Sequence, residues 1–133
     1  MIGIGGVATL KLSLSGDRTR SYFGIYTIRD YPDVLQRTLS HGTTLHGTEL
    51  TRPGLELTRT SYYGPDSGIG LTLDRAQNLY GARARVAIVG LGTGTLSCYR
   101  QPGEQWTFYE IDPAMVHLAR DSGRFGFMPR CGA

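Results

Sequence analysis

Three alternating glycines and one glutamate form the most informative chemical pattern in this chain of 133 residues. The stretch Gly90-Leu-Gly-Thr-Gly94 directly follows the apolar run 85–89. Glycine lets the backbone turn sharply and lets a ligand approach the peptide groups closely. Glu110 follows Gly90 by twenty positions, and its carboxylate can accept hydrogen bonds from two ribose hydroxyls. The pattern predicts a site for a nucleoside.

The spacing of the glycines narrows the kind of ligand. Dinucleotide-binding proteins carry G-x-G-x-x-G between a strand and a helix, with an acidic residue about twenty positions further on. Here the spacing is G-x-G-x-G. It favours S-adenosylmethionine or a related compound without a pyrophosphate over NAD. The alternative is that the glycines serve only tight turns and packing.

The elements that must position this pattern alternate between strand and helix. We expect a helix at 74–80, a strand at 85–89, a short helix at 95–100, a strand at 106–109 and a helix at 112–120. Asp74 and Gly81 suit the start and end of the first helix, and Asp112-Pro113 suits the start of the last. The apolar run 85–89 is typical of a strand covered on both faces. This order predicts the opening of a doubly wound parallel sheet over residues 74–133.

Residues 1–73 follow a different period. Leu10, Leu12 and Leu14 alternate with polar residues, which places them on one face of a strand. Further strands are expected at 22–28, 34–39 and 43–50, with turns at 15–17, 31–33 and 52–54. The pattern predicts an antiparallel β-meander as a first domain.

Composition excludes several classes of protein. Hydrophobic residues make up 40% of the chain and charged residues 19%, which argues against disorder. The net charge is +3, but the arginines are scattered and form no basic stripe, so no nucleic-acid partner is expected. No apolar run approaches the roughly 20 residues of a membrane span, and no secretion leader is recognisable.

The two cysteines give a separate expectation about location. Cys98 and Cys131 form no C-x-x-C pair and have no histidine at ligand spacing. They are interpreted as free thiols in the reducing environment of the cytoplasm, and no metal site is expected.

Four stretches together resemble the spermidine synthase family. They are Val89-Gly-Leu-Gly-Thr-Gly-Thr95, Phe108-Tyr-Glu-Ile-Asp-Pro113, Arg37–Gly47 and Ser61–Gly68. The resemblance extends from about Tyr22 to the C-terminus. It is closest to the spermidine-synthase-like domains that are fused behind transporter-like membrane regions.

The resemblance implies a fold, an activity and a site. The fold is an N-terminal β-domain beside the first β-α-β-α part of a class I, Rossmann-like methyltransferase domain. The activity is transfer of the aminopropyl group of decarboxylated S-adenosylmethionine to an amine such as putrescine, without a metal. The implied cofactor-binding residues are Gly90, Leu91, Gly92, Thr93, Gly94, Glu110, Ile111 and Asp112, and the implied substrate-pocket residues are His46, Tyr62 and Tyr63.

Two departures from the family pattern shape the expectation. Thr93 stands where members usually carry an aspartate that contacts the aminopropyl amine. The catalytic aspartate and the adenine-recognition motif are expected beyond Ala133. Two parallel strands are also fewer than the five or six of an ordinary sheet, so the chain is interpreted as a fragment. A homodimer and a membrane-embedded region in a longer parent stay open.

Three functions are therefore considered: an aminopropyltransferase-like domain, an S-adenosylmethionine-dependent methyltransferase and a non-catalytic nucleoside-binding module. Each candidate side chain also has a structural alternative. His41 and His46 can cap strand ends, and the tyrosine pair 62–63 can cover a core edge. N-capping alone accounts for Asp112. His117 is expected to be solvated, and Asp66 to bond within its own turn.

Overall fold

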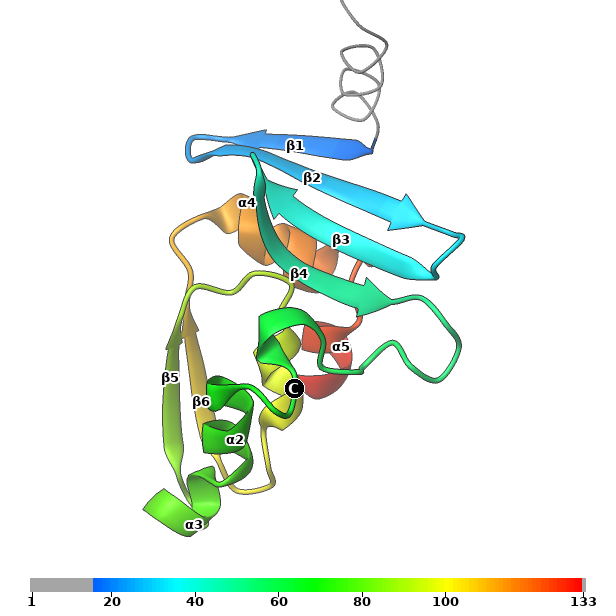
Figure 1. The fold of residues 1–133 in the computed structure, drawn as a ribbon. Helices are drawn as coiled ribbons and strands as arrows, with labels where there is room; N and C mark the ends of the chain where they lie inside the picture. The colour runs from blue at the N-terminus through cyan, green and yellow to red at the C-terminus, as the bar shows by residue number, and fades with distance from the viewer. Residues whose placement is uncertain (1–15, 133) are drawn as a thin grey trace, which may run out of the picture.

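The computed structural model describes residues 16–132, which form a four-stranded antiparallel meander followed by a two-stranded parallel sheet interleaved with helices (Figure 1). The meander strands are β1 (Asp17–Ser21), β2 (Gly24–Tyr31), β3 (Gln36–His41) and β4 (Thr44–Leu50). They pair in sequence order, and the β3–β4 register shifts between Leu39 and Ser40. The expected meander is confirmed.

The first half differs from the prediction in detail. Residues 17–21 form β1 although they contain no large apolar side chain, because all five pair with residues 24–28 of β2. Tyr22 and Phe23, predicted to begin a strand, instead form the β1–β2 turn. The predicted turns at 31–33 and 52–54 are present. Leu10, Leu12 and Leu14 lie outside the described residues.

A helical segment connects the two sheets. It contains the 3₁₀ turn η1 (Ser61–Tyr63), α2 (Gly68–Asp74) and α3 (Ala76–Tyr80). The prediction that Asp74 caps a helix is wrong, because Asp74 is the last residue of α2. Ser67 caps α2 instead, and its hydroxyl oxygen accepts from the Gly70 N–H at 3.0 Å. Gly81 ends α3, as expected.

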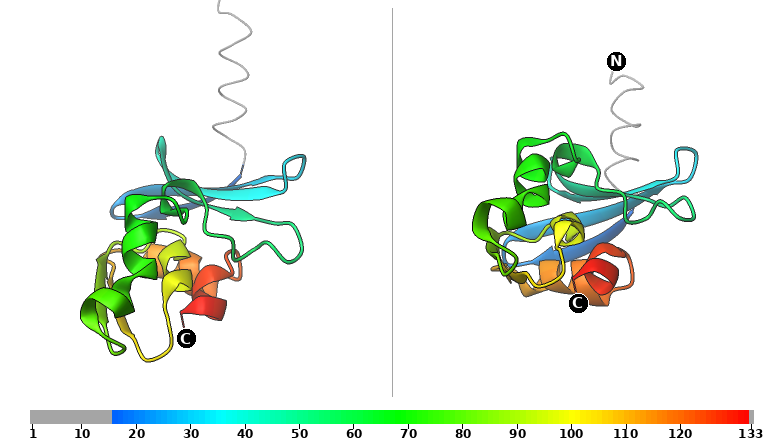
Figure 2. Two further views of the ribbon diagram at one scale, coloured as in Figure 1. Left: turned by 60° about the horizontal axis from the view of Figure 1, so that its bottom comes forward. Right: turned by 90° about the horizontal axis from the view of Figure 1, so that it is seen from below.

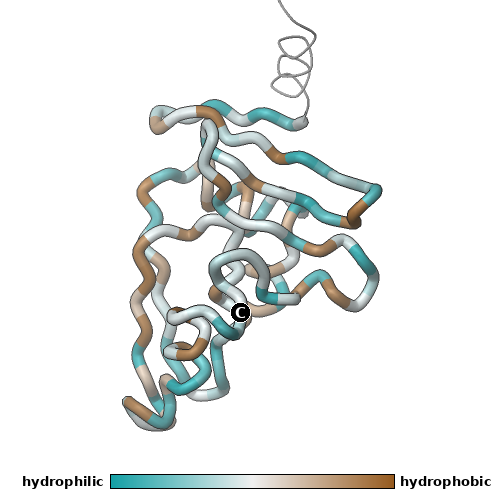
Figure 3. The backbone as a smooth tube through the Cα atoms, in the orientation of Figure 1, coloured by the Kyte–Doolittle hydropathy of each residue, from teal (hydrophilic) through white to brown (hydrophobic). Residues whose placement is uncertain are grey.

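The parallel sheet contains β5 (Arg85–Val89) and β6 (Gln105–Tyr109), paired residue by residue. Both strands were predicted, but β5 is not covered on both faces. Val86 and Ile88 pack with Leu73, Leu96 and Tyr99, whereas Val89 is 89% exposed. The hydrophobic stretch of β5, brown in Figure 3, therefore has one open face.

The remaining helical elements are short. The 3₁₀ turn η2 (Thr95–Tyr99) follows β5, and α4 (Pro113–Val116) follows β6. A π-helical turn, η3 (His117–Asp121), continues α4, and α5 (Phe127–Cys131) comes last. As predicted, the Asp112 carboxylate caps α4, accepting from the Ala114 N–H at 2.9 Å, with Pro113 at the first helical position.

One hydrophobic cluster joins the meander to the helices beneath it. In Figures 1 and 2 the meander is one layer, and α4 and α5 lie against it. Tyr26, Ile28 and Leu39 contribute from the strands, and the helical side contributes Leu91, Met115, Leu118, Ala119, Phe125 and Phe127. The predicted domain boundary, between 73 and 74, falls within α2 and stays a prediction.

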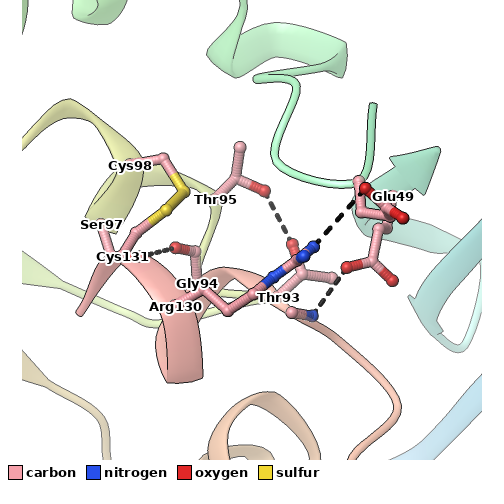
Figure 4. Close-up of a disulfide and its surroundings, with 10 residues drawn as sticks. Glu49, Thr93, Gly94, Thr95, Ser97, Cys98, Arg130 and Cys131 are labelled. Carbon is pink, nitrogen blue, oxygen red and sulfur yellow. Dashed lines mark hydrogen bonds and ion pairs between the residues drawn. A yellow bond between two sulfur atoms is a disulfide. The ribbon is translucent and has the colours of Figure 1, made fainter. Parts of the chain in front are cut away.

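Cys98 and Cys131 form a disulfide between η2 and α5 (Figure 4). The prediction of two free thiols is therefore wrong. The cysteines are 33 positions apart in the sequence, but the packing of α5 on η2 brings their Cα atoms to 4.9 Å. The argument for a reducing compartment loses its basis, and the cytoplasmic location stays a prediction. Within residues 16–132, no helix has the length and apolar character of a membrane span.

Candidate functional site

The chain bends sharply where β5 ends. Gly90 and Gly92 have positive φ angles of 88° and 56°, which side chains larger than glycine adopt only with strain. The Gly90 N–H donates to the Tyr109 carbonyl at 2.8 Å. The first residue of the bend is therefore still hydrogen-bonded to the end of β6. A Cβ atom at Gly92 would lie 2.7 Å from the His46 carbonyl oxygen. The β3–β4 hairpin therefore lies directly against the glycine bend.

Glu110 lies at this bend, immediately after β6. Its Oε2 accepts from the Leu91 N–H at 2.9 Å, and its Oε1 accepts from the Asp112 N–H at 2.9 Å. The carboxylate thus connects the two loops that follow the parallel strands. Each carboxylate oxygen has a second lone pair, so the group can still accept hydrogen bonds from a ligand.

A cavity of about 550 Å³ opens beside Glu110. The hairpin and β2 supply Tyr26, His41 and His46, and the helical connection supplies Tyr63 and Ile69. The rest of the lining is the parallel sheet, its glycine bend and nearby apolar residues: Ala87, Ile88, Val89, Gly90, Leu91, Gly92, Leu96, Glu110 and Met115. The structure therefore brings together six of the predicted site residues: His46, Tyr63, Gly90, Leu91, Gly92 and Glu110.

Aromatic side chains from the hairpin, β2 and η1 line part of the cavity. The His41 and His46 rings have centroids 5.8 Å apart, and the His41 ring lies 4.8 Å from that of Tyr26. Burial, and next the charge of His41, lower the pKa of His46, against the opposing effect of Glu110. Burial also raises the pKa of Tyr63. At neutral pH, His46 is uncharged and Tyr63 keeps its proton.

Asp112 holds the meander against the α4 end of the site. Its Oδ2 accepts from the Ser21 hydroxyl at 2.5 Å and the Tyr26 hydroxyl at 2.6 Å, and its Oδ1 caps α4. Burial alone would raise the pKa of Asp112, but these hydrogen bonds lower it overall. Burial and the bond to Asp112 raise the pKa of Tyr26 to about 12. These contacts satisfy Asp112 within the protein, and it does not line the cavity.

Several other predicted site residues point elsewhere. Thr93 is buried with its hydroxyl 2.9 Å from that of Thr95, and it packs against Gly47 of β4 (Figure 4). Gly94 packs against Met128 of α5. Ile111 is largely exposed, as is Tyr62, whose hydroxyl donates to the Leu45 carbonyl at 3.4 Å. None of these residues lines the cavity, and their contact with a ligand stays a prediction.

Eight residues of the cavity were not among the predicted site residues, and two of them, Tyr26 and His41, carry polar groups. Tyr26 was assigned to a strand and His41 to the link between two strands, where it was considered a capping residue. Side chains alternate between the two faces of β2, so Tyr26 shares a face with Ile28. The sequence does not show that this face packs near the end of β6. The proximity of Tyr26 to Asp112, 86 positions away, is a tertiary contact.

A second cavity of about 550 Å³ shares Leu91 and Glu110 with the first. Trp106, Phe108 and Glu104 also line it. The buried Glu104 carboxylate accepts from the Trp106 ring N–H at 2.7 Å and the Gln101 N–H at 2.9 Å. Across residues 16–132, no cluster of histidine, cysteine and acidic side chains has an arrangement suited to a metal ion.

Comparison of the chain with protein-family models, with curated proteins and with solved structures finds no match.

Proposed function

We propose that this chain binds the adenosyl group of S-adenosylmethionine or its decarboxylated form, as a spermidine-synthase-like transferase domain. The observation that carries the proposal is the position of Glu110. Its carboxylate is hydrogen-bonded to the glycine bend and faces the same cavity as Gly90 and Gly92. The sequence pattern predicted this pairing of a glycine bend with an acidic side chain.

The geometry suits a nucleoside. Glu110 offers one remaining acceptor position on each carboxylate oxygen to the two ribose hydroxyls, because each oxygen already accepts one backbone N–H. Leu91, Leu96 and Met115 supply apolar surface for the rest of the ligand. The cavity volume of about 550 Å³ is within the range of small-molecule sites.

The proposed transfer follows from the chemistry of the sulfonium. A neutral amine attacks the carbon next to the positive sulfur, the carbon–sulfur bond breaks, and the thioether leaves with the bonding electron pair. The protein has mainly to hold the two reactants in line. Tyr63 and His46 line the cavity, and in this proposal they contact the polyamine substrate. The aspartate expected to accept the amine proton is predicted beyond Ala133.

A methyltransferase is the second candidate, and the position of Thr93 favours it. The glycine loop has a threonine, Thr93, at the position of the family's aspartate and so offers no carboxylate there. The Thr93 side chain packs against Gly47 and does not line the cavity. An aminopropyl ammonium would therefore lack a loop carboxylate to neutralise it. A non-catalytic nucleoside-binding module is the third candidate.

The test is calorimetric titration of the whole chain with both ligands. Glu110→Gln keeps the side chain's size but replaces one acceptor oxygen with a donor, so we expect at least a tenfold loss of affinity for both, about 1.4 kcal/mol. The matched control is Asp121→Asn, since the Asp121 carboxylate is paired with Arg120 at the surface. Unchanged affinity in Glu110→Gln, or binding of neither ligand, would refute the proposed site.

A further inference from the structure

The cavity beside Glu110 has an unusual balance of charged groups. Its lining contains one carboxylate, Glu110, and no lysine or arginine. The groups in its wall that can become positive are the imidazoles of His41 and His46. The two proposed ligands share the adenosyl group, the sulfonium and the amine, and differ in a single carboxylate. A positive group beside that carboxylate is one means by which a site can distinguish them, because it attracts the ligand that carries the carboxylate.

The two histidines come from the two strands of one hairpin and are held differently. His41 ends β3, and its ring packs between Tyr26 and the backbone of Gly24. His46 lies in β4, half-buried, where its carbonyl contacts the glycine bend at Gly92. Both rings therefore line the cavity next to the bend. If Glu110 holds the ribose, the far end of an adenosyl ligand can reach these rings.

Groups on four surrounding elements determine the charge of the cavity wall at these rings. Glu110, after β6, and Asp112, before α4, bring negative charges close enough to act on His46 and His41 respectively. Tyr26 from β2 and Tyr63 from η1 stay neutral, because burial raises the pKa of both hydroxyls. Burial and repulsion between the histidines favour the neutral form of His46. Imidazole is the side chain whose protonation adds positive charge in the range between pH 8 and pH 5, so these two rings are the means by which the wall can change its charge.

We propose that His41 and His46 determine which ligand the site prefers: protonated, they select the ligand that carries a carboxylate, and neutral, they favour the decarboxylated one. The inference rests on the proposed function, because it assumes that Glu110 holds the ribose. A protonated imidazole beside the ligand carboxylate forms a charge-assisted hydrogen bond in a half-buried site. The decarboxylated ligand has an additional net positive charge and is repelled by the same imidazolium.

The experiment measures the dissociation constants of both ligands for the whole chain between pH 8 and pH 5. We expect the affinity ratio to shift toward S-adenosylmethionine by about fivefold to tenfold as the pH falls. His46→Gln should flatten this dependence. His46→Lys should fix the preference for S-adenosylmethionine at pH 8, because lysine is charged there. His117→Gln is the matched control, since His117 is exposed on η3, outside the cavity lining.

A second measurement uses the reciprocity of binding and protonation. S-adenosylmethionine should raise the pKa of His46 in an NMR titration, and the decarboxylated ligand should lower it. If both ligands bind but their affinity ratio is independent of pH and of His46→Gln, the inference is wrong and the proposed function survives. If neither ligand binds, both are overturned.

Discussion

The two sheets of this chain differ in how many strands they contain and in how well their side chains are buried. In the meander, four neighbouring strands pair in antiparallel register, and Ile28 and Leu39 are buried in the main hydrophobic cluster. In the parallel sheet, two strands pair with each other and have no further strand beside them among residues 16–132. Val89 and Tyr109 at the ends of these strands are mostly exposed.

The difference shows where the candidate site obtains its rigidity. The glycine bend and Glu110 belong to the small sheet, but their surroundings include the larger one: His46 lies against Gly92, and Tyr26 donates to Asp112. We infer that the meander, the disulfide and the Asp112 network hold the parallel sheet in place. Substitutions in the meander, at the disulfide and at Asp112 test this difference between the two sheets.

The largest effect is expected in the meander. Leu39 is fully buried in β3, and Leu39→Ala should lower the free energy of unfolding by about 2–5 kcal/mol, since it leaves a cavity in the joint cluster. Val89→Ala in β5 should change it by less than about 0.5 kcal/mol, because Val89 is exposed. Urea unfolding followed by circular dichroism measures both. Equal losses in the two variants would contradict the comparison.

The disulfide is expected to rank second. It closes a loop with a sequence separation of 33, and removing such a crosslink costs about 3–4 kcal/mol through the entropy of the unfolded chain. Cys98→Ser and Cys131→Ser each remove this crosslink. The two variants should therefore lower the midpoint of urea unfolding equally. Cys98→Ser treated with a reducing agent is the control, since this variant has no disulfide and the reagent should not lower its stability further. A reduced protein as stable as the oxidised one would show that α5 packs adequately without the bond.

The smallest of the three effects is expected at Asp112. Asp112→Asn weakens charge-assisted bonds from Ser21, Tyr26 and Ala114, and should cost about 2–3 kcal/mol at pH 7. Asp33→Asn, in the exposed β2–β3 turn, is the matched control.

The same variant also has a pH signature. The pKa of Asp112 is lower in the folded protein than in the unfolded chain. Its stabilising contribution is thus complete above the unfolded value, near 4, and is lost as the pH falls toward the folded value. The unmodified chain should lose more stability than Asp112→Asn between pH 5 and pH 2. Parallel losses would show that the network contributes no pH-dependent stability.

Local patterns predicted much of the second half. Three predicted features are present: the strands β5 and β6 and the helix start at Asp112-Pro113. Each of them is determined by residues that are neighbours in the sequence. The β1 strand was missed because its five residues are polar and arginine-rich, so only pairing with β2 makes it a strand. The open face of β5 was missed because an apolar run does not show what covers it.

For the candidate site, sequence spacing predicted the glycine bend and Glu110 and could not predict the wall with the aromatic side chains. That wall comes from β2, the β3–β4 hairpin and η1, and its position over the bend depends on contacts between residues far apart in the chain. The disulfide was missed for the same reason. The family resemblance implied that Gly94 binds the cofactor together with Gly90 and Gly92, whereas Gly94 packs against Met128 and does not line the cavity.

The contact between Gly92 and the His46 carbonyl has a consequence for how a molecule reaches the cavity. The His46 carbonyl packs against Gly92, and the Tyr26 hydroxyl donates to Asp112, so both contacts would have to break for the two halves to separate at the cavity. We expect access by rotation of rim side chains such as Ile69, on the time scale of rotamer exchange, and no clamshell opening.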